Sequence, residues 1–167
     1  ARTAVALAEP ALQLMSVVEA HGSDAFLAPR IQALAGGASL ADLARDDQVQ
    51  ALFAPLLREH VETRTAIESS AVMENGVLRF DLVGTGRERY NKFIAYDLFP
   101  DSRYTVSVTA SDRRVKVSVG SNPWSPRPRT HDIAELCARY GGGGHPVVGA
   151  VSLASGESDA AGVGLYQ

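Results

Sequence analysis

The chain changes its hydrophobic period at about residue 71, and this change restricts it to folds that combine helices with a sheet. Before that point, apolar residues recur every three or four positions among good helix formers, which is the period of amphipathic helices. After it, β-branched residues alternate with polar ones between turn residues, which is typical of strands. We therefore predict an α+β protein with a helical linker or packing segment at residues 1–70 and a second domain at residues 71–167.

Capping residues indicate where the helices of the first region begin and end. Ser23 or Asp24 is placed to cap one helix, which Gly36-Gly37 closes. Ser39 starts the next helix, and Asp46-Asp47 begin a long one. These helices contain no motif with chemistry of its own, so we expect them to serve packing.

Two hairpins are predicted in the second region. Asn75-Gly76 separates two alternating runs, and this dipeptide is the strongest short-range signal of a hairpin. Further along, strands at Tyr104–Thr109 and Val115–Val119 are joined by the turn residues Ser111–Arg114. The second domain therefore contains at least these four strands.

Two helices and a last strand complete the predicted domain. Apolar spacing predicts one helix from Glu88 to Leu98 and another from about His131 to Tyr140, capped by Thr130, before a strand at Val147–Leu153. The resulting order, β-β-α-β-β-α-β, predicts a two-layer domain with its helices on one face of a mixed sheet. The tail after Ser155, rich in Gly, Ala and Ser, is expected to be peripheral.

Composition places the chain among ordinary globular proteins. Its hydrophobic content is 46% and its charged content 21%, whereas a disordered chain has less of the first and a larger net charge. No apolar run approaches the roughly 20 residues that cross a bilayer, and the first residues lack the hydrophobic core of a signal peptide. The single cysteine, Cys137, lies in an apolar helical pattern and is expected to be buried. These features lead us to expect a cytoplasmic protein without a membrane partner.

Charge is distributed unevenly along the chain. Residues 1–76 hold 5 Arg and 10 Asp/Glu, a balance of −5, whereas residues 77–167 hold 11 Lys/Arg and 9 Asp/Glu, a balance of +2. This modest excess suits a small anionic ligand better than a long duplex, which draws a strongly basic face. Ordinary surface charge explains the same counts equally well.

Four consecutive glycines, Gly141 to Gly144, stand between the last predicted helix and the last strand and are followed by His145 and Pro146. One glycine is enough to end a helix. Additional glycines let successive backbone N–H groups converge on an anion, and His145 adds a ring nitrogen that can donate to a phosphate oxygen. The motif is not a P-loop, because no Gly-Lys-Ser/Thr follows. The alternative explanation is a tight turn crowded against a sheet edge.

The segment before the last helix contains the only tryptophan of the chain, Trp124, among prolines and arginines. An exposed Trp124 can stack on a nucleobase, whereas a buried one anchors a long loop, and we expect the second. Ser121 and Asn122 are candidate donors to a phosphate or sugar, with ordinary turn chemistry as the alternative.

The helix Asp132–Tyr140, followed by Gly142-Gly143-Gly144-His145-Pro146 and a small-apolar strand, resembles the C-terminal DHH-associated domain (DHHA type 1) of DHH-family phosphoesterases. That family has exopolyphosphatase-like and nano-RNA hydrolase-like members, and the resemblance covers roughly residues 75–155. The resemblance implies that Gly142, Gly143, Gly144 and His145 hold substrate phosphate. It also implies that a separate N-terminal domain binds manganese through Asp/His clusters.

One departure from the family pattern concerns a cation. In the family, the strand before the last helix often ends in Arg-Ser, and the arginine reaches a terminal phosphate or a base. This chain has Gly120-Ser121 there, so Arg127 or Arg129 in the following Pro-rich segment is a candidate replacement.

A second departure concerns metal ligands. A two-metal phosphoesterase site needs several oxygen and nitrogen ligands, but the histidines neither form an Asp-His-His motif nor cluster with carboxylates; they are His21, His60, His131 and His145. We read His131-Asp132 as capping and surface residues. We therefore expect no catalytic residue, no metal site and no cofactor in this chain, and Mn²⁺ is implied only for a full-length enzyme by resemblance.

The sequence predicts that the chain binds the phosphate of a short oligonucleotide, a cyclic or linear dinucleotide, or polyphosphate. Catalysis would need a metal-binding domain outside this chain, which alone would be inactive. Its expected partners are a phosphate-bearing small molecule or short single-stranded nucleic acid, and the catalytic domain. The alternative is a nucleic-acid-binding or dimerisation module without hydrolase activity, since similar domains are attached to alanyl-tRNA synthetases.

Overall fold

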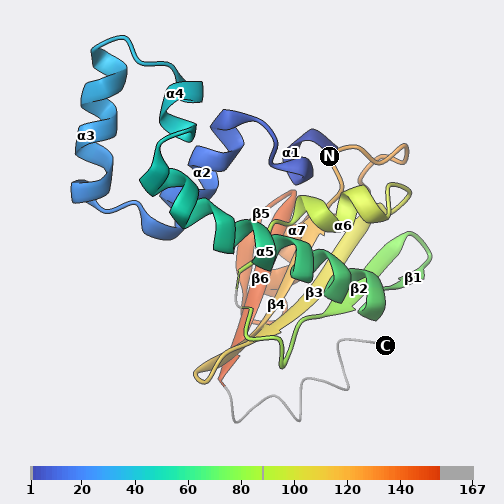
Figure 1. Ribbon diagram of the computed structural model, residues 1–167. Helices are drawn as coiled ribbons and strands as arrows, with labels where there is room; N and C mark the ends of the chain where they lie inside the picture. The colour runs from blue at the N-terminus through green and yellow to red at the C-terminus, as the bar shows by residue number, and fades with distance from the viewer. Residues whose placement is uncertain (1, 88, 155–167) are drawn as a thin grey trace. The chain divides into compact units, whose positions relative to one another are not determined.

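The computed structural model describes residues 2–87 and 89–154, which divide into two compact units (Figure 1). Unit 1 runs to Glu62 and unit 2 begins at Thr63, so the division falls within one long helix. That helix ends at Ser70, which is where the predicted helical segment ends. Glu88 and the tail after Ser155 lie outside the described residues.

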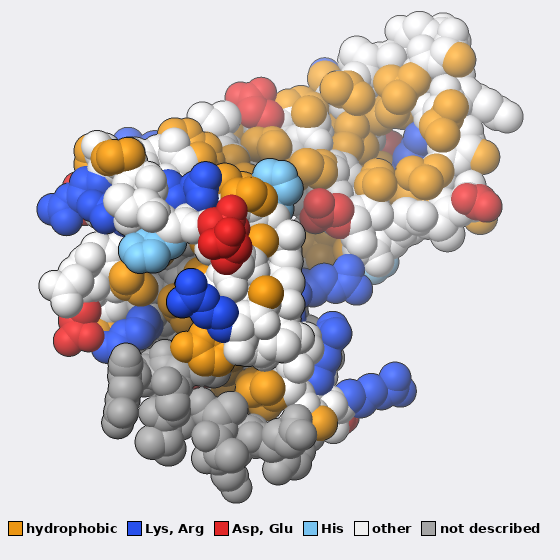
Figure 2. All heavy atoms as spheres, turned by 180° about the vertical axis from the view of Figure 1, so that it is seen from behind, with side chains coloured by type: hydrophobic (Ala, Val, Ile, Leu, Met, Phe, Trp, Pro, Cys, Tyr) orange, Lys and Arg blue, Asp and Glu red, His pale blue; other side chains and the backbone are white. Residues whose placement is uncertain are grey.

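Unit 1 is helical, and its helices bury their apolar faces in a common core. The helices are α1 (Arg2–Ala6), α2 (Pro10–His21), α3 (Asp24–Ala35), α4 (Leu40–Ala44) and the first part of α5 (Asp47–Ser70). The core consists of Leu7, Leu14, Val17, Phe26, Ala44, Val49 and Phe53. Figure 2 shows that hydrophobic side chains also gather on the outer surface of these helices. The large exposed ones on α2 to α4 are Met15, Val18, Ile31, Leu34 and Leu40.

The predicted helix caps at Ser23 and Ser39 are confirmed. The Ser23 hydroxyl accepts the amide of Phe26 at 3.3 Å. Ser39 and Asp42 form a reciprocal capping box, and the hydrogen bonds from Ser39 lower the pKa of the Asp42 carboxyl. Helix α1 was not predicted, and it is only five residues long.

Unit 2 is built on a six-stranded mixed sheet with the strand order β1-β2-β3-β4-β6-β5. The strands are β1 (Val72–Glu74), β2 (Val77–Asp81), β3 (Tyr104–Ala110), β4 (Arg114–Ser121), β5 (Gly143–His145) and β6 (Val148–Ala154). Strands β2 and β3 are parallel, and every other neighbouring pair is antiparallel. The predicted α+β class and mixed sheet are confirmed. The glycine segment adds one strand, β5, that the sequence did not predict.

Both predicted hairpins are present. Asn75 and Gly76 have φ angles of 50° and 81°, and the register Glu74↔Val77 leaves only these two residues in the turn. Two left-handed residues in a two-residue loop are the geometry that an Asn-Gly pair favours. The second hairpin joins β3 to β4 through Ser111–Arg113, with Ala110 paired to Val115.

The two helices of unit 2 differ from their predicted bounds. Helix α6 (Phe93–Leu98) begins later than predicted, and the Asn91 side chain just before it accepts the amide of Phe93 at 3.0 Å. Tyr90 is not helical. Its hydroxyl lies 2.6 Å from that of Ser107, and burial raises the pKa of Tyr90 to about 12.

Helix α7 (Ile133–Ala138) is shorter than predicted and is capped differently. Asp132, and not Thr130, is its N-cap, since the Asp132 carboxylate accepts the amide of Glu135 at 3.2 Å. The interpretation of Asp132 as a capping residue is therefore confirmed.

Helices α6 and α7 pack on opposite faces of the sheet, which differs from the expected placement on one face. On the α6 face, the Tyr96 hydroxyl lies 3.3 Å from the hydroxyl of Thr105. On the α7 face, Ile133 and Cys137 form a core with Val151. Cys137 is buried, as predicted, and burial raises the pKa of its thiol.

Candidate phosphate-binding site

The glycine segment first closes helix α7 and then becomes a strand. The amide of Gly141 donates to the carbonyl of Ala138 at 3.2 Å, and that of Gly142 to the carbonyl of Cys137 at 2.9 Å. These two amides are therefore bonded within the fold. The following residues form β5, which is the edge of the sheet among the described strands. An edge strand presents its outward-facing amides to solvent, so an anion could bind only there or at His145.

Packing explains only two of the four glycines. A Cβ on Gly142 would lie 2.2 Å from the carbonyl oxygen of Ala150, and one on Gly144 would lie 2.3 Å from that of Val148. Both positions therefore require glycine because β6 passes close by. A Cβ on Gly143 would meet nothing within 4 Å. The crowded-turn explanation therefore applies to Gly142 and Gly144 but not to Gly143.

His145 lies on the α6 face at the exposed end of β5. It pairs with Val148, which pairs with Gly120, which in turn pairs with Thr105. Residues directly opposite each other on paired strands project to the same face, so this row carries His145 to the side where Thr105 meets α6. His145 is exposed.

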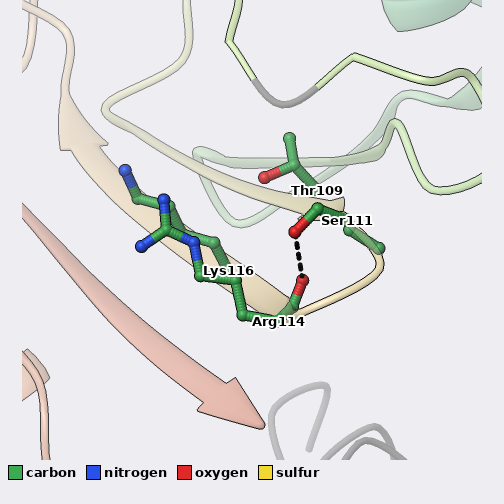
Figure 3. Close-up of a pocket in the computed structure, with 5 residues that line it drawn as sticks. Thr109, Ser111, Arg114 and Lys116 are labelled. Atoms are coloured by element: carbon green, nitrogen blue, oxygen red, sulfur yellow. Dashed lines mark hydrogen bonds between the residues drawn. The ribbon is translucent and has the colours of Figure 1, made fainter. Parts of the chain in front are cut away.

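The same face is open to solvent along the neighbouring strands. We call this area the open sheet surface; it comprises the exposed or partly exposed residues Lys116, Ser118, Ala150, Ser152 and His145. At its far end, a small surface pocket is lined by Thr109, Ala110, Ser111, Arg114 and Lys116 (Figure 3). Figure 3 shows the two cationic side chains lying side by side there. Sequence reasoning did not single them out, although their spacing of two on one strand places them on one face.

A tyrosine occupies the position from which the family arginine would project. A Cβ on Gly120 would lie 2.5 Å from the hydroxyl oxygen of Tyr96, which is only 5% exposed. Burial raises the pKa of the Tyr96 hydroxyl. No arginine fits at residue 120 while Tyr96 keeps this place. Sequence reasoning missed Tyr96, although a glycine within a strand indicates that another group approaches the backbone closely.

The side chains of Ser121 and Asn122 both form hydrogen bonds to other parts of the chain. The Ser121 hydroxyl donates to the carbonyl of Val147 at 3.1 Å. Asn122 is 7% exposed, and its side-chain nitrogen donates to the carbonyl of Ser102 at 3.0 Å. Its side-chain oxygen accepts the amide of Trp124 at 2.9 Å. Asn122 therefore positions the loop that carries the tryptophan.

The two candidate cations of the Pro-rich loop lie at opposite edges of the sheet. Arg127 is beside the first hairpin, where a Cβ on Gly76 would lie 3.8 Å from its guanidinium. Strands β2 and β5 are four strand spacings apart, or about 19 Å, so Arg127 is remote from the glycine segment. Arg129 is close to it, because its guanidinium donates to the carbonyl of Pro146 at 2.9 Å.

Trp124 is not buried, so the prediction of a buried loop anchor is wrong. Its side chain is 48% exposed. The ring packs edge-on against Phe93, with 5.2 Å between the ring centroids, and lies 6.4 Å from the ring of Tyr96. The loop is held by the buried side chain of Asn122 instead, which leaves the tryptophan at the surface.

Within residues 2–87 and 89–154, no group of three or more His, Cys, Asp or Glu side chains is placed to hold a metal ion. Over the same residues, no helix combines the length and apolar character that a membrane span requires.

Comparison with known proteins identifies the fold. No family model matches the chain, and no curated protein matches it. Among solved structures, the pGpG-specific phosphodiesterase PggH from Vibrio cholerae matches 86% of this chain with a TM-score of 0.67 and 21% identity. An exopolyphosphatase-related protein from Bacteroides fragilis matches 64% of the chain at 12% identity with a TM-score of 0.39.

The PggH match agrees with the resemblance to the DHH-associated domain and confirms it at the level of the fold. Unit 2 accounts for less than two thirds of the chain, so a match over 86% also includes part of the helical unit 1. The chain spans about half the length of PggH, because the match covers 50% of that protein.

Proposed function

We propose that this chain is the substrate-holding part of a phosphoesterase of the DHH family, with His145 as its principal phosphate ligand. The observation that carries the proposal is the placement of His145. Its imidazole is exposed at the edge of the sheet, on the face that keeps Lys116 and Gly143 open to solvent. The fold shared with part of PggH supports the same class of activity.

The chain's own residues would bind and orient the substrate. A ring nitrogen of His145 donates to a non-bridging phosphate oxygen, and the outward-facing amides of β5 add neutral donors. Gly143 lets the phosphate approach the backbone, since no side chain covers it. Lys116 and Arg114 contribute positive charge on the same face. Such groups favour a reaction by positioning the substrate and stabilising charge that develops on phosphate oxygens.

Metal chemistry would come from a domain outside this sequence. The described residues contain no suitable ligand cluster. In the proposed full-length enzyme, Mn²⁺ would supply an activated hydroxide and polarise the phosphate. The substrate would be a short phosphorylated molecule, and the fold shared with PggH favours a linear dinucleotide over polyphosphate.

Calorimetric titration tests the phosphate role of His145. The chain would be titrated with pGpG and, separately, with tripolyphosphate, which carries phosphate without a base. We expect both to bind, and the His145→Ala variant to lose roughly tenfold or more affinity for both, as for the loss of one charge-assisted hydrogen bond. His21→Ala in unit 1 is the control and should bind like the parent. Unchanged affinity in the His145→Ala variant would remove the assigned role.

A dimerisation module remains the second candidate, because unit 1 exposes an apolar surface. Ile31 is 61% exposed and Leu40 is 47% exposed, and both are large side chains on neighbouring helices. Figure 2 shows hydrophobic side chains gathered on the surface of this unit, and exposed apolar patches mark interaction sites. Sedimentation velocity should show a dimer for this candidate, and Ile31→Glu should convert it to a monomer.

A further inference from the structure

An aromatic surface is held rigidly beside the α6 face. Trp124 is 48% exposed and Phe93 is 39% exposed, and their rings meet at 77°. The buried ring of Tyr96 supports both from below, at centroid distances of 6.4 and 6.5 Å. The Trp124 backbone is fixed by the buried Asn122. The exposed part of the indole is therefore preorganised, which reduces the entropy lost when a ligand binds.

Tyr96, which supports the aromatic surface, and His145 lie along one row of the sheet. The Tyr96 hydroxyl sits directly over Gly120, whose cross-strand neighbours are Val148 and then His145. Strands β4 and β5 are two strand spacings apart, so Gly120 and His145 are separated by about 10 Å. A stacked strand advances about 3.4 Å per nucleotide, so this distance corresponds to roughly one to three nucleotides.

The two ends of this row offer different groups, one suited to the base of a nucleotide and the other to its phosphate. One end offers an aromatic ring, which attracts the π-face of any base. The other end offers His145, whose exposed imidazole suits phosphate. Polyphosphate has no group that would use the indole.

We propose that Trp124, supported by Phe93, stacks on a nucleobase of the ligand whose phosphate binds at His145. The proposal rests on the proposed function and deepens it, because it selects short nucleotides over polyphosphate. Base stacking tolerates different bases, so Trp124 provides affinity for a base without sequence preference.

Tryptophan fluorescence reports on this contact directly, because Trp124 is the only tryptophan of the chain. Titration with pGpG should quench the emission as the base stacks, whereas tripolyphosphate should bind without comparable quenching. Binding of pGpG without a change in emission would overturn the proposal.

Calorimetry on variants provides the second readout. Trp124→Ala should weaken pGpG binding by roughly 5- to 150-fold and leave tripolyphosphate binding unchanged. Trp124→Phe, which keeps a ring, should retain most of the affinity. Tyr140→Ala is the matched control, because Tyr140 is 54% exposed and follows α7, which packs on the other face. It should bind both probes like the parent.

The outcomes separate this inference from the proposed function. Equal pGpG affinity in the parent and Trp124→Ala, with a loss in His145→Ala, would overturn the stacking role and keep the phosphate role. Binding of neither probe to the parent chain would overturn both.

Discussion

The two faces of the sheet in unit 2 use the same strands for different purposes. On the α7 face, Val117 and Val151 are each 4% exposed, and Val151 packs with Ile133. On the other face, the adjacent residues Lys116 and Ser152 remain at least partly open to solvent. Alternation along a strand thus lets one sheet stabilise the fold on one face while leaving polar groups free for a ligand on the other.

The largest expected effect is a loss of stability on the α7 face. Ile133 is fully buried, so Ile133→Ala should lower the free energy of unfolding by about 2–5 kcal/mol, through lost burial and a cavity. Ser152→Ala on the open sheet surface should change the free energy of unfolding by less than about 0.5 kcal/mol. Urea denaturation measures both, and similar losses at the two sites would contradict the distinction between the faces.

Substitutions at Gly142 and Gly143, which are adjacent, should also differ in their effect on stability. Gly142→Ala would place a Cβ 2.2 Å from the Ala150 carbonyl, so we expect destabilisation by about 1–3 kcal/mol. Gly143→Ala has open space and should leave stability nearly unchanged, while reducing tripolyphosphate affinity. Thermal unfolding with calorimetric titration tests this pair. A stable Gly142→Ala variant would mean that β6 does not constrain the segment.

Tyr96 and Gly120 compete for space on the α6 face of the sheet. Gly120→Ala should destabilise unit 2 by about 1–2 kcal/mol, because its Cβ would clash with the Tyr96 hydroxyl. In the Tyr96→Phe background the same substitution should cost less, since the hydroxyl is gone. A double-mutant cycle by urea denaturation measures the difference. Strict additivity would show that the two groups do not compete for space.

Local sequence signals predicted the features that depend on a few neighbouring residues. Ser23 and Ser39 marked helix starts, and Asn75-Gly76 marked a hairpin, because each acts on its own backbone. Helix α6 was predicted to start too early because the apolar spacing around Tyr90 suits a helix, whereas its hydroxyl pairs with Ser107 of β3.

Features set by distant contacts could not be predicted in the same way. Residue 142 must be glycine because the Ala150 carbonyl of β6 lies close to it. The face on which α7 packs depends on its contacts with strands that are distant in the sequence. The exposure of Trp124 depends on Asn122 bonding to Ser102, twenty residues away. Of the candidate site residues, the sequence motif identified His145, but only the fold shows which face it shares with Lys116.

NMR titration of the imidazole resonances shows whether His145 receives the phosphate. The chain has four histidines, of which His21 and His60 serve as internal controls. Addition of tripolyphosphate should shift the His145 ring resonances and the backbone amides of β5, and leave the rings of His21 and His60 unchanged. Saturating phosphate binding that leaves the His145 ring unperturbed would contradict the account.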